Sequence, residues 1–137
     1  MSEALPWGDR VRGRRWLRER EIRLTAARAA LAELRDAVTA AFRDRPPFHL
    51  VYVRDRGWVW RSAAWMGPRR VYSRAEELLA ALAGLPASTA AWYADIEARR
   101  VALTTAERLL TAECAAVRRW LADAEALHRN PFASMQD

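Results

Sequence analysis

The chain has 137 residues, of which 52% are hydrophobic and 29% are charged, and its formal net charge is +6. This composition excludes an intrinsically disordered chain, because so many apolar residues can form a buried core, and the length fits a single domain, residues 1–137. Because Cys114 is the only cysteine, no disulfide can form within one chain. We find no secretory signal and no apolar run of the roughly 18 residues that a membrane span needs. We therefore expect a cytoplasmic protein.

The positive charge is concentrated in one part of the chain. All 23 basic residues are arginines, and residues 43–74 contain eight of them against two aspartates, an excess of six. This segment alone accounts for the whole net charge, so it is the first place to look for an anionic partner. Six arginines between residues 10 and 20 are diluted by Glu19 and Glu21, and a solvated helix start explains them equally well.

Residues 9–44 are predicted to form a long helix. Leu17, Leu24, Leu31 and Val38 recur every seven residues, which gives an apolar stripe flanked by charges. Pro46 and Pro47 end the helix, since proline cannot continue the hydrogen-bonding pattern.

Residues 47–72 change to a β pattern. Residues 48–53 and 58–65 are rich in β-branched and aromatic side chains, and Asp55-Arg56-Gly57 supplies the turn of a hairpin between them. This turn predicts three cross-strand pairs: Arg54 with Trp58, Tyr52 with Trp60, and Leu50 with Ser62. Residues 70–72 are a candidate third strand.

Two further helices follow. Residues 74–84 are predicted to be a short helix, opened by a capping box from Ser73 to Glu76. Residues 88–129 form the last helix, in which five apolar residues again recur every seven positions: Ile96, Leu103, Leu110, Val117 and Ala124. We expect a mainly helical α+β fold, in which two long antiparallel helices form a coiled-coil-like stalk and the hairpin and short helix are inserted between them.

Residues suited to catalysis or metal binding are scarce. His49 and His128 lie on different elements, the five glycines stand singly, and Cys114 lies in the apolar pattern of the last helix. Acids such as Glu97 and Glu113 alternate with arginines, which is typical of a solvated helix face. We therefore predict no catalytic residue, no metal site and no cofactor.

The hairpin carries the candidate binding residues. Arginines would hold phosphates and aromatic rings would stack on unpaired bases, a combination found in single-strand-binding proteins. The arginines are Arg54, Arg56, Arg61, Arg69, Arg70 and Arg74, and the aromatic residues are Tyr52, Trp58 and Trp60. In the alternative, which we favour for the aromatic residues, the rings form the core and the arginines keep the protein soluble.

Several short motifs resemble a family of uncharacterised proteins encoded on bacterial integrating conjugative elements. They are Pro47-Phe48-His49-Leu50, Trp58-x-Trp60-Arg61, Met66-Gly67, Leu85-Pro86-Ala87-Ser88 and the segment 95–103. The likeness covers roughly residues 30–129. It implies a setting in the maintenance, replication or transfer of mobile DNA, and no mechanism.

Three hypotheses follow. The first is a non-enzymatic nucleic-acid-binding accessory protein, with DNA favoured over RNA. The second is a helical adaptor that forms a homodimer or binds another protein through its heptad helices. The third is an inhibitor of a nucleic-acid enzyme. We rank it last, because residues 75–137 have a charge of only −3, from six arginines and nine acids, which is too small for a surface that imitates DNA.

Overall fold

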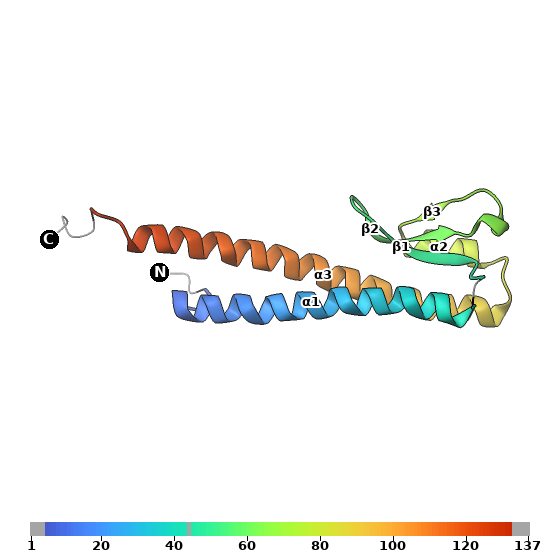
Figure 1. Cartoon of the computed structure of the whole chain (residues 1–137), viewed down its shortest axis with the longest axis horizontal. Helices are drawn as coiled ribbons and strands as arrows, with labels where there is room; N and C mark the ends of the chain where they lie inside the picture. The colour runs from blue at the N-terminus through green and yellow to red at the C-terminus, as the bar shows by residue number, and fades with distance from the viewer. Residues whose placement is uncertain (1–4, 44, 133–137) are drawn as a thin grey trace. The chain divides into compact units, whose positions relative to one another are not determined.

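The structure is a computed structural model that describes residues 5–43 and 45–132. In chain order its elements are α1 (Arg10–Ala41), β1 (Phe48–Val53), β2 (Gly57–Ser62), the 3₁₀ turn η1 (Ala64–Met66), β3 (Val71–Tyr72), α2 (Ala75–Leu82) and α3 (Ala87–His128) (Figure 1). The mainly helical fold with a small antiparallel sheet is confirmed. The candidate third strand is present as β3.

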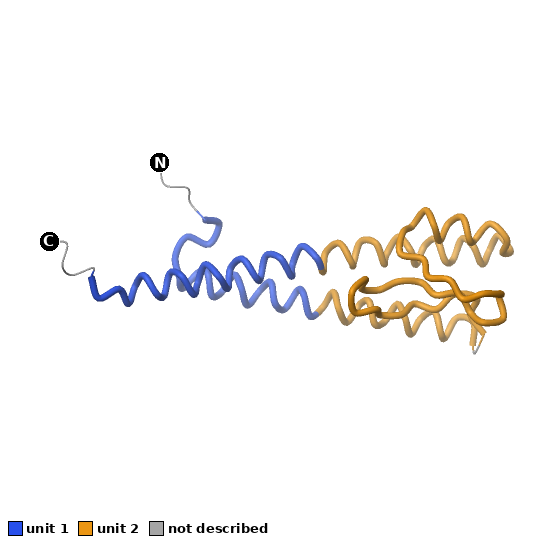
Figure 2. The backbone as a smooth tube through the Cα atoms, turned by 90° about the horizontal axis from the view of Figure 1, so that it is seen from above, with its two compact units in different colours: residues 1–25, 108–137 blue, residues 26–107 orange. Residues whose placement is uncertain are grey.

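The chain divides into two compact units (Figure 2). Unit 1 combines the N-terminal residues up to Thr25 with the residues from Arg108 onward, and unit 2 is Ala26–Glu107. Both units contain segments of α1 and of α3. None of the helices in the described ranges combines the length and the apolar character needed to cross a membrane.

In unit 1 the segments of α1 and α3 pack antiparallel. Arg14 forms an ion pair with Glu125 at 3.0 Å, and Arg20, further along α1, pairs with the earlier Glu113 at 3.0 Å. Leu24, Cys114 and Val117 are buried in this unit, and Leu24 and Val117 belong to the predicted seven-residue series. The carboxylate of Glu113 also accepts a 2.7 Å hydrogen bond from Trp16 Nε1, so Glu113, which is half-buried, bonds α3 to α1 and is not part of a fully solvated face.

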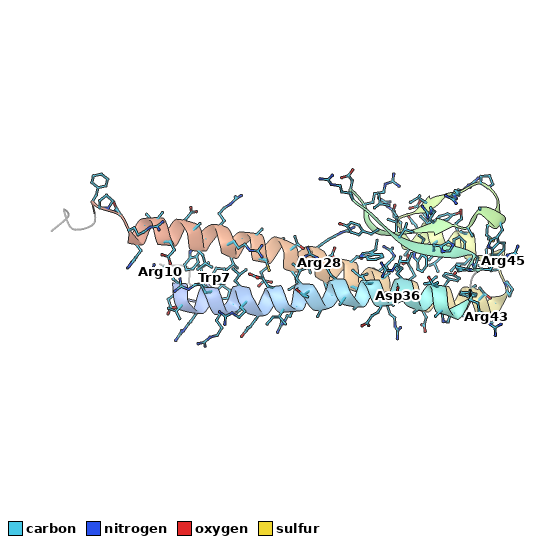
Figure 3. The ribbon with its side chains drawn as sticks, in the orientation of Figure 1. Trp7, Arg10, Arg28, Asp36, Arg43 and Arg45 are labelled. Carbon is cyan, nitrogen blue, oxygen red and sulfur yellow. The ribbon has the colours of Figure 1, made fainter. Side chains whose placement is uncertain are left out.

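Gly13 allows three tryptophans to meet at the start of α1. The ring of Trp7 lies 5.9 Å from that of Trp16 and 5.5 Å from that of Trp120, centre to centre. A Cβ atom on Gly13 would stand 3.0 Å from Trp120 Cζ3 and 3.1 Å from Trp7 Cδ1. Any side chain at this position would therefore press on these rings. Trp7 and Arg10 are labelled at this end of α1 in Figure 3.

Unit 2 has the larger core. The sheet lies along the unit 2 segments of α1 and α3 (Figure 1), and its inner face meets both helices and α2. The buried residues shared among these elements are Leu31, Leu34, Val38, Phe48, Leu50, Trp58, Trp60, Leu78, Leu82, Tyr93 and Ile96. They include Leu31 and Val38 from α1 and Ile96 from α3, so both helices contribute to this core.

The sheet has the order β1-β2-β3, with antiparallel neighbours. Tyr52 pairs with Trp58, and Leu50 pairs with Trp60, so the predicted pairing is wrong by two residues. The turn consists of residues 54–56, and Gly57, with φ of 79°, is the first residue of β2. A shift of two residues preserves the alternation of side chains, so each side chain of the hairpin lies on the same face in the predicted and in the observed pairing.

Two local predictions near the sheet also need correction. The predicted return strand includes Trp65, but β2 ends at Ser62 and Trp65 lies half exposed in η1. The capping interaction of α2 is one residue later than predicted, because Arg74 N donates to Glu77 Oε1 at 3.1 Å. Glu76 instead pairs with the guanidinium of Arg74 at 3.6 Å.

A buried ion pair ties α3 to the sheet. Glu97 and Arg100 are both buried, and Arg100 Nε donates to Glu97 Oε1 while Nη2 donates to Oε2 at 3.0 Å. Trp60 Nε1 donates to the same carboxylate at 3.1 Å, and Arg100 Nη1 donates to the carbonyl oxygen of Trp58 at 2.9 Å. The prediction of a solvated face is therefore wrong for Glu97, since β2 covers it.

Candidate anion-binding pocket and arginine surface

The predicted arginines are exposed. Arg54, Arg56, Arg61, Arg69 and Arg70 form no ion pair with any carboxylate in the described part of the chain, whereas Arg74 pairs with Glu76. Their charges are thus available to an external anion. In unit 1, by contrast, Arg10, Arg14 and Arg20 are paired with acids of α3.

The six arginines occupy several places in unit 2. Arg54 and Arg56 lie in the turn, and Arg61 lies four residues along β2 from Gly57, roughly 13 Å away at about 3.3 Å per residue. Arg70 lines a separate hollow beside Tyr72 and Ala81, and Arg74 precedes α2. Only Arg61 and Arg69 share one pocket.

The aromatic residues separate into core and surface. Trp60 is 0% exposed and Trp58 is 9% exposed, whereas Tyr52 is 60% exposed. The hypothesis of a stacking platform is therefore wrong for Trp58 and Trp60, whose rings pack on α1 and α3 because the inner face of the sheet needs large apolar groups. Tyr52, whose ring lies 5.7 Å from that of Trp58, lies on the same face of the sheet as Trp58, and it is the one predicted aromatic residue that is exposed to solvent.

A pocket of about 240 Å³ lies between β1, β2 and α1 in unit 2. Its basic residues are Arg35 from α1, His49 from β1, Arg61 from β2 and Arg69 from the loop before β3. The remaining lining residues are Thr39, Leu50, Val51, Ser62, Ala63 and Ala64. The lining thus includes three guanidinium groups and an imidazole, and no carboxylate.

The positive charge of this pocket affects the pKa of His49. Burial lowers the pKa of His49 below its usual 6.5, and the charges of Arg61 and Arg69 lower it further. Both effects disfavour a proton on the imidazole, because the group is partly desolvated and stands beside two fixed cations. His49 is half-buried on β1, as expected for a strand histidine.

Arg35 is the one basic residue of the pocket that has a carboxylate partner. Its Nε lies 3.1 Å from Asp36 Oδ1, and its guanidinium lies 5.7 Å from the centre of the Trp58 ring. Sequence reasoning missed Arg35 and Thr39, because they belong to a charge-balanced part of α1 and only the packing of the sheet brings them to the pocket.

A second arginine–aromatic contact lies at the end of unit 2. Arg45, labelled in Figure 3 after α1, places its guanidinium 4.9 Å from the centre of the exposed Trp65 ring. This pair places a cation beside an exposed aromatic ring, and Trp65 lies between Arg61 and Arg69 in the sequence.

The residues that the structure describes contain no group of three or more histidine, cysteine, aspartate or glutamate side chains able to hold a metal ion. Cys114 is buried in unit 1, where burial raises the pKa of its thiol. The pocket of Arg35, His49, Arg61 and Arg69, by contrast, is suited to binding anions through its positive charges.

Comparison with protein-family models, curated proteins and solved structures finds no match to this chain.

Proposed function

We propose that this protein is a non-enzymatic nucleic-acid-binding accessory protein that holds phosphate groups with the arginines of residues 54–70. The observation that carries the proposal is the meeting of Arg61 and Arg69 at a pocket without any carboxylate in its lining. Fixed cations without intramolecular partners attract a polyanion, and arginine binds phosphate oxygens through two parallel hydrogen bonds.

The burial of Trp58 and Trp60 limits how bases could be recognised. Base stacking is left to Tyr52 and to the Arg45–Trp65 pair, so most of the binding energy would come from phosphates. The protein would consequently bind many sequences with similar affinity, and its binding would depend strongly on salt. The resemblance to proteins of conjugative elements favours DNA as the ligand.

A salt titration with labelled oligonucleotides tests this proposal. We expect the variant Arg61→Gln/Arg69→Gln to lose at least about tenfold in affinity at low salt, and its plot of log K against log salt to become shallower by about 0.9 for each phosphate group that the variant no longer neutralises. Arg108→Gln/Arg119→Gln removes the same charge from exposed positions of α3 in unit 1 and serves as the matched control.

Equal losses in both double variants would mean that only net charge matters. If the wild-type protein has no affinity for single-stranded or duplex DNA at low salt, the proposal is wrong.

One observation favours a helical adaptor as the second candidate function. Val11 and Ile22 are exposed on one side of α1, and Leu109 and Leu127, which are 67% and 72% exposed, lie eighteen residues apart on one side of α3. In this proposal the α1–α3 pair is a coiled-coil-like stalk whose outer apolar residues bind a further helix. Sedimentation would then show a dimer or complex that survives high salt, and Leu109→Gln/Leu127→Gln would dissociate it.

A further inference from the structure

The pocket beside His49 contains more positive charges than there are carboxylates to pair with them in the described part of the chain. Three guanidinium groups line about 240 Å³, and among the described residues only Arg35 has a carboxylate partner. Arg61 and His49 are directly opposite each other on adjacent strands, so the sheet itself holds these two groups together. Like charges gathered in this way repel each other, and an anion bound between them would offset this repulsion.

The shape and lining of the pocket select the kind of anion. Leu50, Val51, Ala63 and Ala64 complete the lining, and none of them carries a charge that would compete with the arginines. The recess can admit a compact tetrahedral group that projects from its carrier. An internal phosphodiester supplies one negative charge and is attached to the strand on both sides, whereas a terminal phosphate monoester supplies up to two charges and is attached on one side.

We infer that the pocket formed by Arg35, His49, Arg61 and Arg69 is a site for a doubly charged tetrahedral anion, and that its ligand is the terminal phosphate monoester of a nucleic-acid strand. This inference rests on the proposed function and adds a specific subsite to it. Arg61 and Arg69 supply the main ion pairs, Arg35 closes the α1 side, and His49 gains a positive charge and a second N–H donor when it takes up a proton.

The site couples anion binding to protonation of His49. In the free protein the pKa of His49 lies below 6.5, because the imidazole is buried beside Arg61 and Arg69, with Arg35 as the charged group on the α1 side. A bound dianion offsets these charges and raises the pKa of His49. Affinity must therefore increase as pH falls through the pKa of the bound state, and level off below the lower pKa of the free state.

Sulfate is the appropriate probe for this coupling, because it remains a dianion throughout the range in which histidine titrates, whereas phosphate does not. The chain has two histidines, so proton NMR resolves one imidazole signal of His49 and one of His128, and His128→Gln assigns them. We expect saturating sulfate to raise the pKa of His49 by roughly one unit and to leave that of His128 unchanged. A shift of this size corresponds to about a tenfold gain in affinity as pH falls from above the pKa of the bound state to below the pKa of the free state.

Three variants test the role of the pocket residues. Arg69→Gln should weaken sulfate binding at least tenfold, and His49→Gln should bind sulfate with little pH dependence. Arg108→Gln, at an exposed position of α3 in unit 1, is the control and should bind sulfate like the wild-type protein. A second arm compares one oligonucleotide with a phosphate and with a hydroxyl at its 5′ end, and we expect several-fold tighter binding of the phosphorylated strand, a difference that Arg69→Gln abolishes.

The possible failures are distinguishable. If both histidines shift equally in sulfate, or if neither shifts, the pocket is not an anion site. If sulfate binds but the two oligonucleotides bind equally well, the site takes free anions and the terminal-phosphate assignment is wrong. In each of these cases the salt-dependent binding of DNA could still be present, whereas its absence would remove the proposed function itself.

Discussion

Glu97 and Arg100 illustrate how a buried charge pair determines the position of β2 on α3. The carboxylate accepts from Arg100 and from Trp60 Nε1, and the guanidinium also donates to the carbonyl oxygens of Trp58 and Ser73. Each buried polar group therefore has several partners. Removing one member would leave the other charged and without a partner inside the protein.

We expect Glu97→Leu to lower the free energy of unfolding by about 3–5 kcal/mol, because the guanidinium of Arg100 would remain buried without its carboxylate. Urea denaturation followed by tryptophan fluorescence measures this loss. Asp95→Leu, at an exposed position of the same helix, is the control and should change stability by less than about 0.5 kcal/mol. The double variant Glu97→Leu/Arg100→Met should recover much of the loss, and a double variant as unstable as the single one would contradict this explanation.

Tyr93 hydrogen-bonds to the backbone of Phe48, the first residue of β1. Its hydroxyl accepts from Phe48 N–H at 3.2 Å and donates to the Phe48 carbonyl oxygen at 2.9 Å, so the first residue of this edge strand has both backbone groups bonded. Burial raises the pKa of Tyr93 to about 12 from the usual 10.0, although the hydrogen bond to Phe48 acts in the opposite direction. The folded state consequently favours the neutral phenol.

This pKa shift predicts an alkaline loss of stability. A raised pKa in the folded state contributes stability that is complete below about pH 10 and is lost as pH rises to about 12, by up to about 3 kcal/mol. Tyr93→Phe should cost about 1–3 kcal/mol at neutral pH and should remove this alkaline loss. Denaturation curves from about pH 8 to about pH 12 give both quantities, and an unchanged alkaline loss in Tyr93→Phe would assign it to another group.

At the scale of elements, Gly13 controls the packing of α1 on α3 in unit 1. We expect Gly13→Leu to destabilise unit 1 by about 1–3 kcal/mol, because its side chain would overlap the rings of Trp7 and Trp120. Hydrogen exchange should accelerate in residues 10–25 and 108–128. Ala29→Leu, at an exposed position of α1, is the control and should leave exchange unchanged. Wild-type exchange rates in Gly13→Leu would show that the rings can move apart at little cost.

The elements were largely predictable from the sequence because their signals are local. Seven-residue spacing of apolar side chains identified α1 and α3, and Pro46 marked the region where α1 has ended. The register of β1 with β2 was missed by two residues, since the chain could place Gly57 either inside the turn or at the start of the strand. A positive φ is required in both arrangements, so the glycine alone does not decide between them.

The candidate site was less predictable, because its geometry depends on packing between distant segments. The charge excess of residues 43–74 identified Arg61 and Arg69, but nothing local indicates that Arg35 joins them or that Arg70 faces a different hollow. Trp58 and Trp60 have the composition of a stacking surface, but we favour the alternative in which these rings form the core, and their burial against α1 and α3 agrees with that alternative. The solvated face predicted for Glu97 is wrong because β2 covers this residue.

At the scale of the whole molecule, the two units differ in how much they bury. Unit 2 holds eleven residues of one shared core, whereas the buried apolar side chains of unit 1 in the described ranges are Leu24, Cys114 and Val117. Helix segments that bury little apolar surface open at a smaller cost in free energy.

We therefore expect amide protection to decrease along α3. Residues 93–103, which pack in the unit 2 core, should exchange more slowly than residues 115–128 by at least about tenfold. Hydrogen exchange measured by mass spectrometry on peptides from α3 provides the comparison. Uniform protection from one end of α3 to the other would mean that both units open in a single cooperative step.

The burial of Cys114 gives unit 1 a built-in reporter. Because this sulfur is the only thiol of the chain and is fully enclosed, a thiol-reactive dye can label it only while the surrounding helices have separated. The labelling rate at rising dye concentration would reach a plateau equal to the opening rate of unit 1. The opening rate of unit 1 could thus be measured in the wild-type protein without an engineered label, both alone and with an oligonucleotide bound.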